Sequence, residues 1–291
     1  MKIGVHGKDF TRQSAPFIEQ ILERLARENV DVHVSSRFQK NLRLAQFKKF
    51  RFKTYEPGDS LRKMDLFFSL GGDGTLLESV THVGKTGVPI FGINTGRLGF
   101  LATIGREEID EAMDLIFRKE YDIDERVLLS LHSDRDLFGG FRYALNDFTL
   151  VRKDSSSMIT VHTFVDGEFL NSYWADGIIV ATPTGSTGYS LSCGGPLVFP
   201  GSECFVVTPV SPHNLTVRPI VVPDDSEITF RVEGRSKKFI VSLDSRMETV
   251  DETAKLMVKK ANIRINLVQL RGQHYFKTLR HKLNWGLDAR N

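Results

Sequence analysis

The sequence has few cysteines and no long apolar run, and these absences exclude several classes of protein. Its 291 residues include two cysteines, Cys193 and Cys204, which are too few for a disulfide framework or a cysteine-based zinc site. No stretch approaches the roughly 18 consecutive apolar residues that a transmembrane helix needs. Residues 1–5 have the pattern of a strand and lack the apolar core and cleavage site of a signal peptide. We therefore expect a cytoplasmic protein with no membrane partner.

An excess of charge of one sign is also missing. The 39 Lys and Arg residues nearly balance the 36 Asp and Glu residues, and the net charge is +3. Because no nucleic-acid recognition motif accompanies this charge, we expect no nucleic-acid partner. One basic segment, residues 37–53, contains no acid and is either a solvated connector or a surface that attracts a phosphate-bearing ligand. Its basic residues are Arg37, Lys40, Arg43, Lys48, Lys49, Arg51 and Lys53.

The common nucleotide-binding and hydrolase motifs are absent from the sequence. No G-x-G-x-x-G follows the first expected strand, and residues 84–86 do not end a P-loop because Ser79 stands where a glycine is required. The histidines form no H-E-x-x-H motif. Residues 185–188 differ from the G-x-S-x-G motif of esterases, so a hydrolase triad is not indicated. Any nucleotide binding or chemistry must therefore use another sequence motif.

The first third of the chain alternates between strand and helix patterns. A helical stripe begins near Phe17 and places Ile18, Ile21, Leu22 and Leu25 on one face. Strands are expected at residues 2–5, 30–34, 65–70 and 89–93, and further helices at residues 75–83 and 109–117. Strands that alternate with helices indicate a mostly parallel sheet covered on both faces. We therefore expect an α/β domain over residues 1–125.

After about residue 126 the pattern changes to short runs rich in Val, Ile, Thr and Phe. Strands are expected at residues 148–151, 159–165, 177–181, 205–208, 228–232 and 239–243. Because no helical stripe interrupts these runs, we expect an all-β domain over residues 126–270. The tail, residues 271–291, is rich in Lys, Arg and Leu. We expect this tail to leave the β domain and to return to the first domain.

The segment with the clearest chemistry comprises Gly71, Gly72, Asp73, Gly74 and Thr75, where an apolar strand meets a helix. Glycines allow the backbone to approach a ligand closely, and their N–H groups at a helix start suit phosphate oxygens. A carboxylate among phosphates is repulsive unless it serves a metal ion or a proton transfer. Asp73 is therefore interpreted as a base, or as a magnesium contact, for a hydroxyl that attacks a phosphoryl group. The alternative is a tight turn with Asp73 as the N-cap of the helix.

A second segment, residues 182–192, combines hydroxyls, glycines and an aromatic residue after a buried strand. Such a loop can hydrogen-bond a ribose or an amide while its aromatic ring stacks on a base, although a purely structural turn is the alternative. Two shorter motifs, Asn146-Asp147 and Asp176-Gly177, stand before expected strands. Each of these pairs alone is typical of an ordinary turn.

Taken together, these segments resemble the NAD kinases of the bacterial type. Residues 71–75, 94–101, 146–147, 176–177 and 182–192 follow the order of the family's motifs, and residues 275–285 are similar to its C-terminal segment. The first motif also occurs in diacylglycerol, sphingosine and phosphofructokinase-type kinases. The motifs at residues 94–101 and 182–192 are much more specific to NAD kinases.

The resemblance implies both a fold and a reaction. The fold is a modified Rossmann-like α/β domain, an NAD-binding β-sandwich-like domain and a tail that packs back on the first domain, with the active site between the domains. The reaction transfers the γ-phosphoryl group of ATP, with a divalent metal such as Mg²⁺, to the 2′-hydroxyl of the adenosine ribose of NAD, giving NADP. Members of this family form dimers and tetramers, so the resemblance also implies a homodimer or a homotetramer. No metal ligands can be assigned from the spacing.

The resemblance also assigns roles to individual residues. Asp73 is expected to be the base and to contact NAD, with Gly74 beside it, while Gly71, Gly72 and Thr75 form the cradle for the phosphates of ATP. Asp176 is expected near the nicotinamide. The remaining residues expected to bind NAD are Asn146, Asp147, Thr187, Gly188, Tyr189, Ser190, Leu191 and Ser192.

Three positions depart from the commonest family pattern, and two other functions remain open. Asp147 stands where many members have glutamate, and Gly188 replaces the usual alanine. Arg246 stands where many members have glutamine, so this cation either favours a phosphate-bearing ligand of the NAD site or pairs with an acid. The alternative functions are a lipid kinase of the diacylglycerol type and a non-catalytic NAD-sensing module. The hydroxyl-rich loop argues against the first, and the retention of Asp73 argues against the second.

Overall fold

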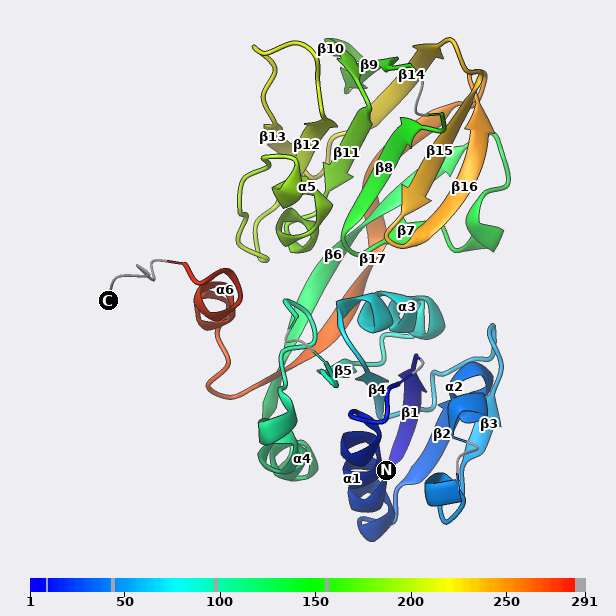
Figure 1. Cartoon of the computed structure of the whole chain (residues 1–291), viewed down its shortest axis with the longest axis vertical. Helices are drawn as coiled ribbons and strands as arrows, with labels where there is room; N and C mark the ends of the chain where they lie inside the picture. The colour runs from blue at the N-terminus through cyan, green and yellow to red at the C-terminus, as the bar shows by residue number, and fades with distance from the viewer. Residues whose placement is uncertain (9, 43–44, 97–98, 155–156, 286–291) are drawn as a thin grey trace. The chain divides into compact units, whose positions relative to one another are not determined.

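The computed structural model describes residues 1–291 except residues 9, 43–44, 97–98, 155–156 and 286–291. The chain divides into two compact units. Figure 1 labels their helices and strands. The first unit is Met1–Glu125 with Ile265–Asn291, and the second is Arg126–Arg264. Two long strands, β6 (Tyr121–Ser133) and β17 (Leu256–Leu270), each begin in one unit and end in the other. The last residues of β17, which the sequence analysis assigns to the β domain, thus belong to the first unit.

The first unit is built on a parallel sheet, as the alternation of strands and helices predicts. The strand order is β17-β5-β4-β1-β2-β3. Neighbouring strands in this order pair in parallel throughout. The strands of the first unit are β1 (Lys2–Gly7), β2 (Asp31–Ser35), β3 (Lys53–Tyr55), β4 (Leu66–Leu70) and β5 (Ile90–Ile93).

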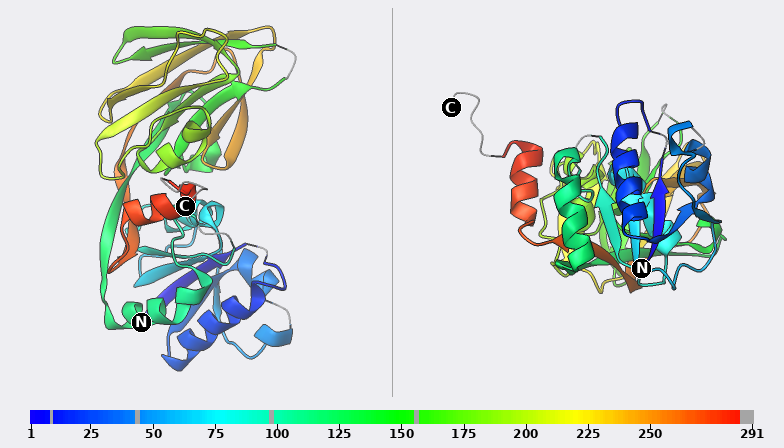
Figure 2. Two further views of the ribbon diagram at one scale, coloured as in Figure 1. Left: turned by 60° about the vertical axis from the view of Figure 1, so that its left-hand side comes forward. Right: turned by 90° about the horizontal axis from the view of Figure 1, so that it is seen from below.

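Helices cover both faces of this sheet. Helices α1 (Ala15–Arg27) and α4 (Ile109–Arg118) lie side by side on one face (Figure 2), where they share a core with Ile3, Val5 and Phe68. The predicted stripe of α1 is confirmed, because all four of its residues are buried. Since side chains alternate along a strand, Phe67 faces the other side and stacks on His82 of α3 (Asp73–Val83). The remaining helices are α2 (Ser36–Asn41) and α6 (Tyr275–Leu283), with 3₁₀ turns η1 (Ala45–Phe47) and η2 (Arg106–Glu108).

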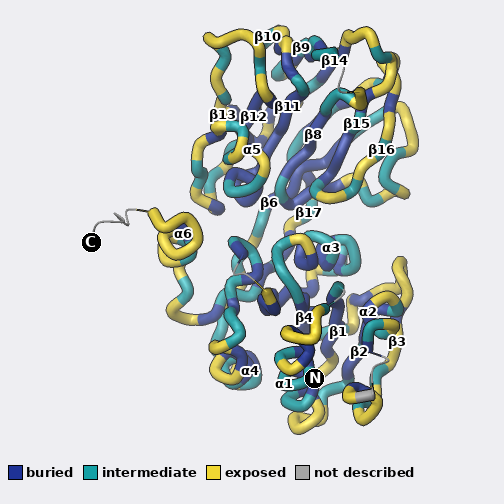
Figure 3. The backbone as a smooth tube through the Cα atoms, in the orientation of Figure 1, coloured by how far each residue is buried: buried dark blue, intermediate teal, exposed yellow. Residues whose placement is uncertain are grey.

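The second unit is a β-sandwich, which confirms the expected fold class. One sheet has the order β13-β12-β11-β8-β15-β16, and the other contains β10-β9-β14-β17. Phe148 of the first sheet stacks on Phe230 of the second with ring centroids 5.4 Å apart. Figure 3 shows the buried strands that surround this core. The strands are β7 (Tyr143–Ala144), β8 (Asp147–Arg152), β9 (Ile159–Val165), β10 (Glu168–Ala175), β11 (Gly177–Ala181), β12 (Cys204–Val210), β13 (Ile220–Pro223), β14 (Ile228–Gly234), β15 (Lys238–Leu243) and β16 (Arg246–Asp251).

Short helical turns interrupt the second unit, although the sequence predicts none there. They are η3 (Phe138–Gly140), η4 (Thr184–Thr187) and α5 (Tyr189–Ser192). Both cysteines are free thiols. Within the described part of the chain, no helix has the length and apolar character that crossing a membrane requires.

Three of the seven basic residues in the segment 37–53 form ion pairs with acids of the first unit. Arg37 lies 2.6 Å from a carboxylate oxygen of Glu78, and Lys53 lies 2.9 Å from one of Asp31. Lys49 bonds to Glu19 and Glu23 from α1. Arg43, which also belongs to the segment, lies outside the described residues.

Candidate active site

The carboxylate of Asp73 is held in a fixed orientation at the start of α3. Its Oδ2 accepts the backbone N–H of Phe100 at 2.8 Å, and its Oδ1 accepts those of Leu101 and Ala102 at 3.0 Å each. A Cβ atom on Gly99 would lie 1.9 Å from Oδ1, so the loop can pass Asp73 only with glycine at this position. A carboxylate has about four acceptor positions, and three are filled by these contacts. One acceptor position of Oδ2 is therefore left for a ligand hydroxyl.

The alternative interpretation of Asp73 as an N-cap is wrong, because Gly72 holds that position. The backbone N–H groups of Gly72, Asp73 and Gly74 have no acceptor within the helix, as in any first helical turn. Together with the positive end of the helix dipole they can bind an anion. Gly71 must remain a glycine here, since a Cβ atom would lie 2.2 Å from Oγ1 of the buried Thr75.

A lysine that the sequence analysis did not single out adds positive charge to this loop. Lys8 follows β1, and its ammonium lies 3.2 Å from the carbonyl oxygen of Gly74. The same ammonium lies 3.3 Å from a carboxylate oxygen of Glu78, one turn further along α3. No local pattern in the sequence links residue 8 to residue 74; parallel pairing of β1 and β4 brings them together.

The family motif at residues 94–101 begins after β5 and borders a pocket. Asn94 Oδ1 accepts the N–H of Gly96 at 2.7 Å, which fixes a tight turn. Arg106 donates to the carbonyl of Thr95 and lies over the ring of Phe17. Two residues of the motif, Arg97 and Leu98, lie outside the described residues.

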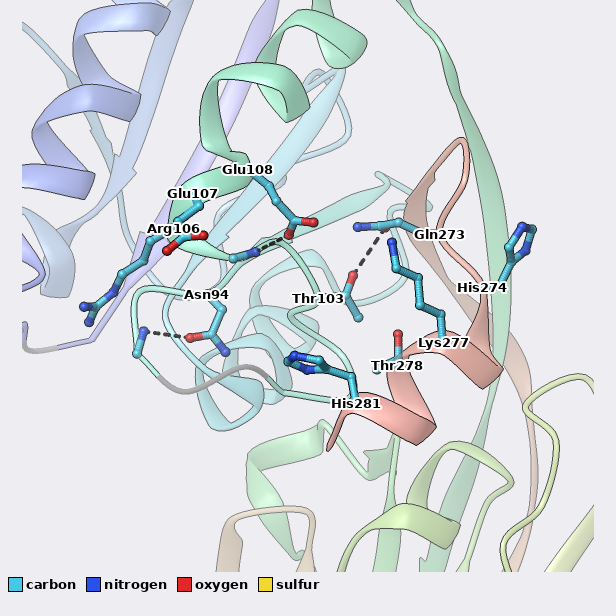
Figure 4. A pocket seen from close by; sticks show the side chains of 12 residues that line it. Asn94, Thr103, Arg106, Glu107, Glu108, Gln273, His274, Lys277, Thr278 and His281 are labelled. Carbon is cyan, nitrogen blue, oxygen red and sulfur yellow. Dashed lines mark hydrogen bonds between the residues drawn. The ribbon is translucent and has the colours of Figure 1, made fainter. Parts of the chain in front are cut away.

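The pocket lies within the first unit and has a volume of about 460 Å³ (Figure 4). Its wall combines the loop after β5 with α6 and the residues just before α6. Thr103 of the loop donates a hydrogen bond of 3.4 Å to Gln273, which precedes α6. Two cations, two carboxylates and two histidines line the pocket. Its charged and titratable lining residues are Arg106, Glu107, Glu108, His274, Lys277 and His281.

In the second unit, Asn146 and Asp147 are positioned by the partly buried carboxylate of Asp244, which no local sequence motif marks. Asp244 accepts the backbone N–H groups of Leu145, Asn146 and Asp147 at 3.0, 2.7 and 3.3 Å. Burial raises the pKa of Asp244, against the effect of these bonds. Burial, and next the charge of Asp244, raises the pKa of Asp147 to about 7. Asp147 is thus poised to titrate near neutral pH.

The loop at residues 182–192 passes directly over Asn146. The N–H of Thr182 donates to the carbonyl of Asn146 at 2.8 Å, and a Cβ atom on Gly185 would lie 2.0 Å from that carbonyl oxygen. A Cβ atom on Gly188 would lie 3.7 Å from Asn146 Nδ2 and 3.8 Å from Asp147 Oδ2. Asn146 Oδ1 is buried and has no hydrogen-bond partner among the described residues. It is therefore an acceptor available to an N–H or O–H group of a ligand.

Two hydroxyls of this loop, those of Thr187 and Ser190, form hydrogen bonds within the fold. Thr187 Oγ1 donates to the carbonyl of Thr184 at 3.2 Å, and Ser190 Oγ is buried against Thr208 Oγ1 at 2.8 Å. Tyr189, by contrast, is 44% exposed and presents its ring to solvent. Leu191 is half-buried and Ser192 is exposed.

Asp176 and Arg246 are each paired within the second unit. Asp176 lies 2.9 Å from the guanidinium of Arg152. Arg246 donates to the carbonyls of Phe141 and Tyr143, and its guanidinium lies 5.5 Å from the ring centroid of Phe138. Burial lowers the pKa of Arg246, while the charge of Asp244 opposes this shift.

Comparisons with known proteins find matches to both units of the chain. The family models for the ATP-NAD kinase N-terminal and C-terminal domains match residues 3–121 and 145–270. The NAD kinase of Cytophaga hutchinsonii is 52% identical over the full length of both chains. An NAD kinase from Archaeoglobus fulgidus, solved in complex with ATP, is 26% identical with a TM-score of 0.73, covering 98% of this chain and 99% of the other. Yeast NADH kinase, complexed with NADH, shares the fold at 23% identity, with a TM-score of 0.83 over 99% of this chain and 88% of the other.

These matches span both units, and the family models cover well over half of the chain. The motif around Asp73 and the loop over Asn146 lie within the matched residues. The chain therefore belongs to the ATP-NAD kinase family.

Proposed function

We propose that this protein is an NAD kinase, which transfers the γ-phosphoryl group of ATP to the 2′-hydroxyl of the adenosine ribose of NAD and so produces NADP. The observation that carries the proposal is the carboxylate of Asp73, oriented by three backbone N–H groups at the start of α3. A full-length relative at 52% identity that is an NAD kinase supports the same reaction.

Asp73 acts as the base in this proposal. The free acceptor position of Oδ2 receives the proton of the 2′-hydroxyl as its oxygen attacks the γ-phosphorus. Phosphoryl transfer needs positioning and charge stabilisation more than a covalent intermediate, so a fixed carboxylate is sufficient. The N–H group of Gly72 holds a phosphate oxygen, with the ammonium of Lys8 nearby. Gly71 and Thr75 shape this cradle.

The second unit supplies the residues that recognise NAD. Asn146 Oδ1 accepts a hydrogen bond from a base or ribose group, and the ionised carboxylate of Asp147 accepts one from a ribose hydroxyl. The exposed ring of Tyr189 stacks on a base of the dinucleotide. Asp176 lies near the nicotinamide of bound NAD in this proposal. The other residues of the second unit that we expect to bind NAD are Thr187, Gly188, Ser190, Leu191, Ser192 and, as a cation, Arg246. In the first unit, Gly74 is expected to contact NAD beside Asp73.

The divalent metal of the reaction fits the available donors. Mg²⁺ prefers oxygen ligands and usually binds through one or two carboxylates together with the phosphates of its nucleotide. Because the free position of Asp73 is taken by the 2′-hydroxyl, the phosphate oxygens of ATP and water would hold the ion. Bound Mg²⁺ would neutralise charge on the transferred phosphoryl group. The homodimeric or homotetrameric state and the cytoplasmic location remain predictions.

The proposal is tested by incubating the purified full chain with NAD, ATP and Mg²⁺ and measuring NADP with an NADP-specific dehydrogenase. NADP formation that requires all three is expected. Binding of NAD without any NADP formation, also with polyphosphate as donor, would favour the NAD-sensing module. Phosphorylation of diacylglycerol but not of NAD would favour the lipid kinase.

A further inference from the structure

Two histidines and one glutamate form a cluster in the first unit that has no role in the proposed reaction. His6 lies near the end of β1, while Glu78 and His82 lie on α3 (Figure 1). One ligand atom from each side chain lies within 4.8 Å of the others. His6 Nε2 is 3.5 Å from Glu78 Oε1, and the ring centroids of His6 and His82 are 4.4 Å apart.

The backbone pattern explains why these three side chains meet. Alternation along β1 turns His6 toward the face of the sheet that α3 covers, and the i, i+4 spacing of Glu78 and His82 places both on one side of the helix. His6 is fully buried, and its Nδ1 bonds to Ser35 Oγ at 2.8 Å. Its Nε2 has no hydrogen-bond partner among the described residues. A histidine fixed through one ring nitrogen, with the other aimed into a cluster, is typical of a metal ligand.

We propose that His6, Glu78 and His82 form a binding site for a transition-metal ion, with Zn²⁺ as the reference ion. Zinc bonds of about 2.0–2.2 Å place the ligands of a tetrahedral site about 3.4 Å apart, and the pair His6–Glu78 already has that separation. Glu78 and His82 are only partly buried and can move to complete the site. Water fills the fourth position. Two imidazole ligands disfavour Mg²⁺, so this site is distinct from the one that holds Mg²⁺ together with ATP.

The cations around Glu78 set the strength of this site. Arg37 donates to Glu78 Oε1 at 2.6 Å, and Lys8 lies 3.3 Å from Oε2. They compensate the carboxylate when no metal is bound, and they repel an incoming divalent ion. The side chain of Arg37 is 62% exposed and can swing into solvent. Replacing Arg37 by a neutral residue should therefore strengthen metal binding. A cluster with only a structural role predicts no such effect.

The experiment is a titration of the metal-free, full-length chain without a histidine tag. Calorimetry with Zn²⁺ should give one ion per chain, and the absorption bands of Co²⁺ should report a tetrahedral site. Bound Zn²⁺ should raise the Tm, because it binds the folded chain preferentially. His82→Gln and Glu78→Gln should each weaken binding by about tenfold or more. His213→Gln, at an exposed histidine of the second unit, is the matched control and should bind as the wild type does.

Arg37→Gln should bind Zn²⁺ more tightly, by about threefold or more, because one competing charge is removed. A wild-type Kd weaker than about 100 µM would overturn the proposal, as would unchanged affinity in His82→Gln. Weaker binding by Arg37→Gln would contradict the account of the charges. Displacement of Zn²⁺ by millimolar Mg²⁺ would contradict the class of metal.

Discussion

The buried carboxylate of Asp147 makes a quantitative prediction for the pH dependence of NAD binding. Its pKa is raised to about 7, first by burial and then by the charge of Asp244. If the ionised form accepts a ribose hydroxyl, affinity is full above this pKa and is lost as the pH falls through it. Protonation then costs about a factor of ten per pH unit below 7. Between about pH 8.5 and 5.5 the affinity should therefore fall by about 30-fold.

Calorimetric titration of the full chain with NAD, in the absence of ATP, measures this effect. Asp147→Asn should bind NAD with an affinity that changes by less than about threefold over the same range, because the titrating group is gone. Asp110→Asn, at an exposed position of α4, is the matched control and should keep the wild-type slope. An affinity of the wild-type chain that does not change with pH would refute the reasoning, as would an unchanged slope in Asp147→Asn.

Two further predictions concern the residues that position the site. Gly99→Ala should lower kcat by about tenfold or more in the NADP assay, since its Cβ atom would displace the carboxylate of Asp73; Gly201→Ala, whose Cβ atom would meet only Phe199 at 3.4 Å, should be near wild type, and equal activities would contradict this account. Asp244→Asn should shift the pH profile of NAD binding to lower pH, because one charge that raises the pKa of Asp147 is removed; a profile that stays in place would show that burial alone sets this pKa.

The sequence was sufficient to predict the elements that carry strong periodicity. The stripe of α1 and the apolar runs of β4 and β5 are buried as expected. Strand β16 was missed because its two apolar residues, Met247 and Val250, are three positions apart, so apolar and polar residue types do not alternate along it. Strand β10 was missed for a similar reason: it is an edge strand, with Tyr173 and Ala175 as its only buried residues.

The candidate site was predictable only where its residues are adjacent in sequence. The glycine-rich loop around Asp73 and the hydroxyl-rich loop at residues 182–192 are visible as local patterns. The partners that orient them are not. The N–H groups that hold Asp73 come from residues 27 to 29 positions away, and Asp244 is 97 to 99 positions from the N–H groups that it accepts. Such contacts depend on strand pairing and tertiary packing, which no short motif records.

The most direct test of the central claim is a comparison of kcat and NAD affinity in Asp73→Asn. The amide oxygen of asparagine can still accept the two N–H groups that Oδ1 accepts, from Leu101 and Ala102, so the loop is largely retained. General base catalysis contributes about 10²- to 10⁴-fold, and kcat for NADP formation should fall by that factor while the Kd for NAD changes by less than about threefold. Turnover within tenfold of the wild-type rate would contradict the assignment of Asp73 as the base.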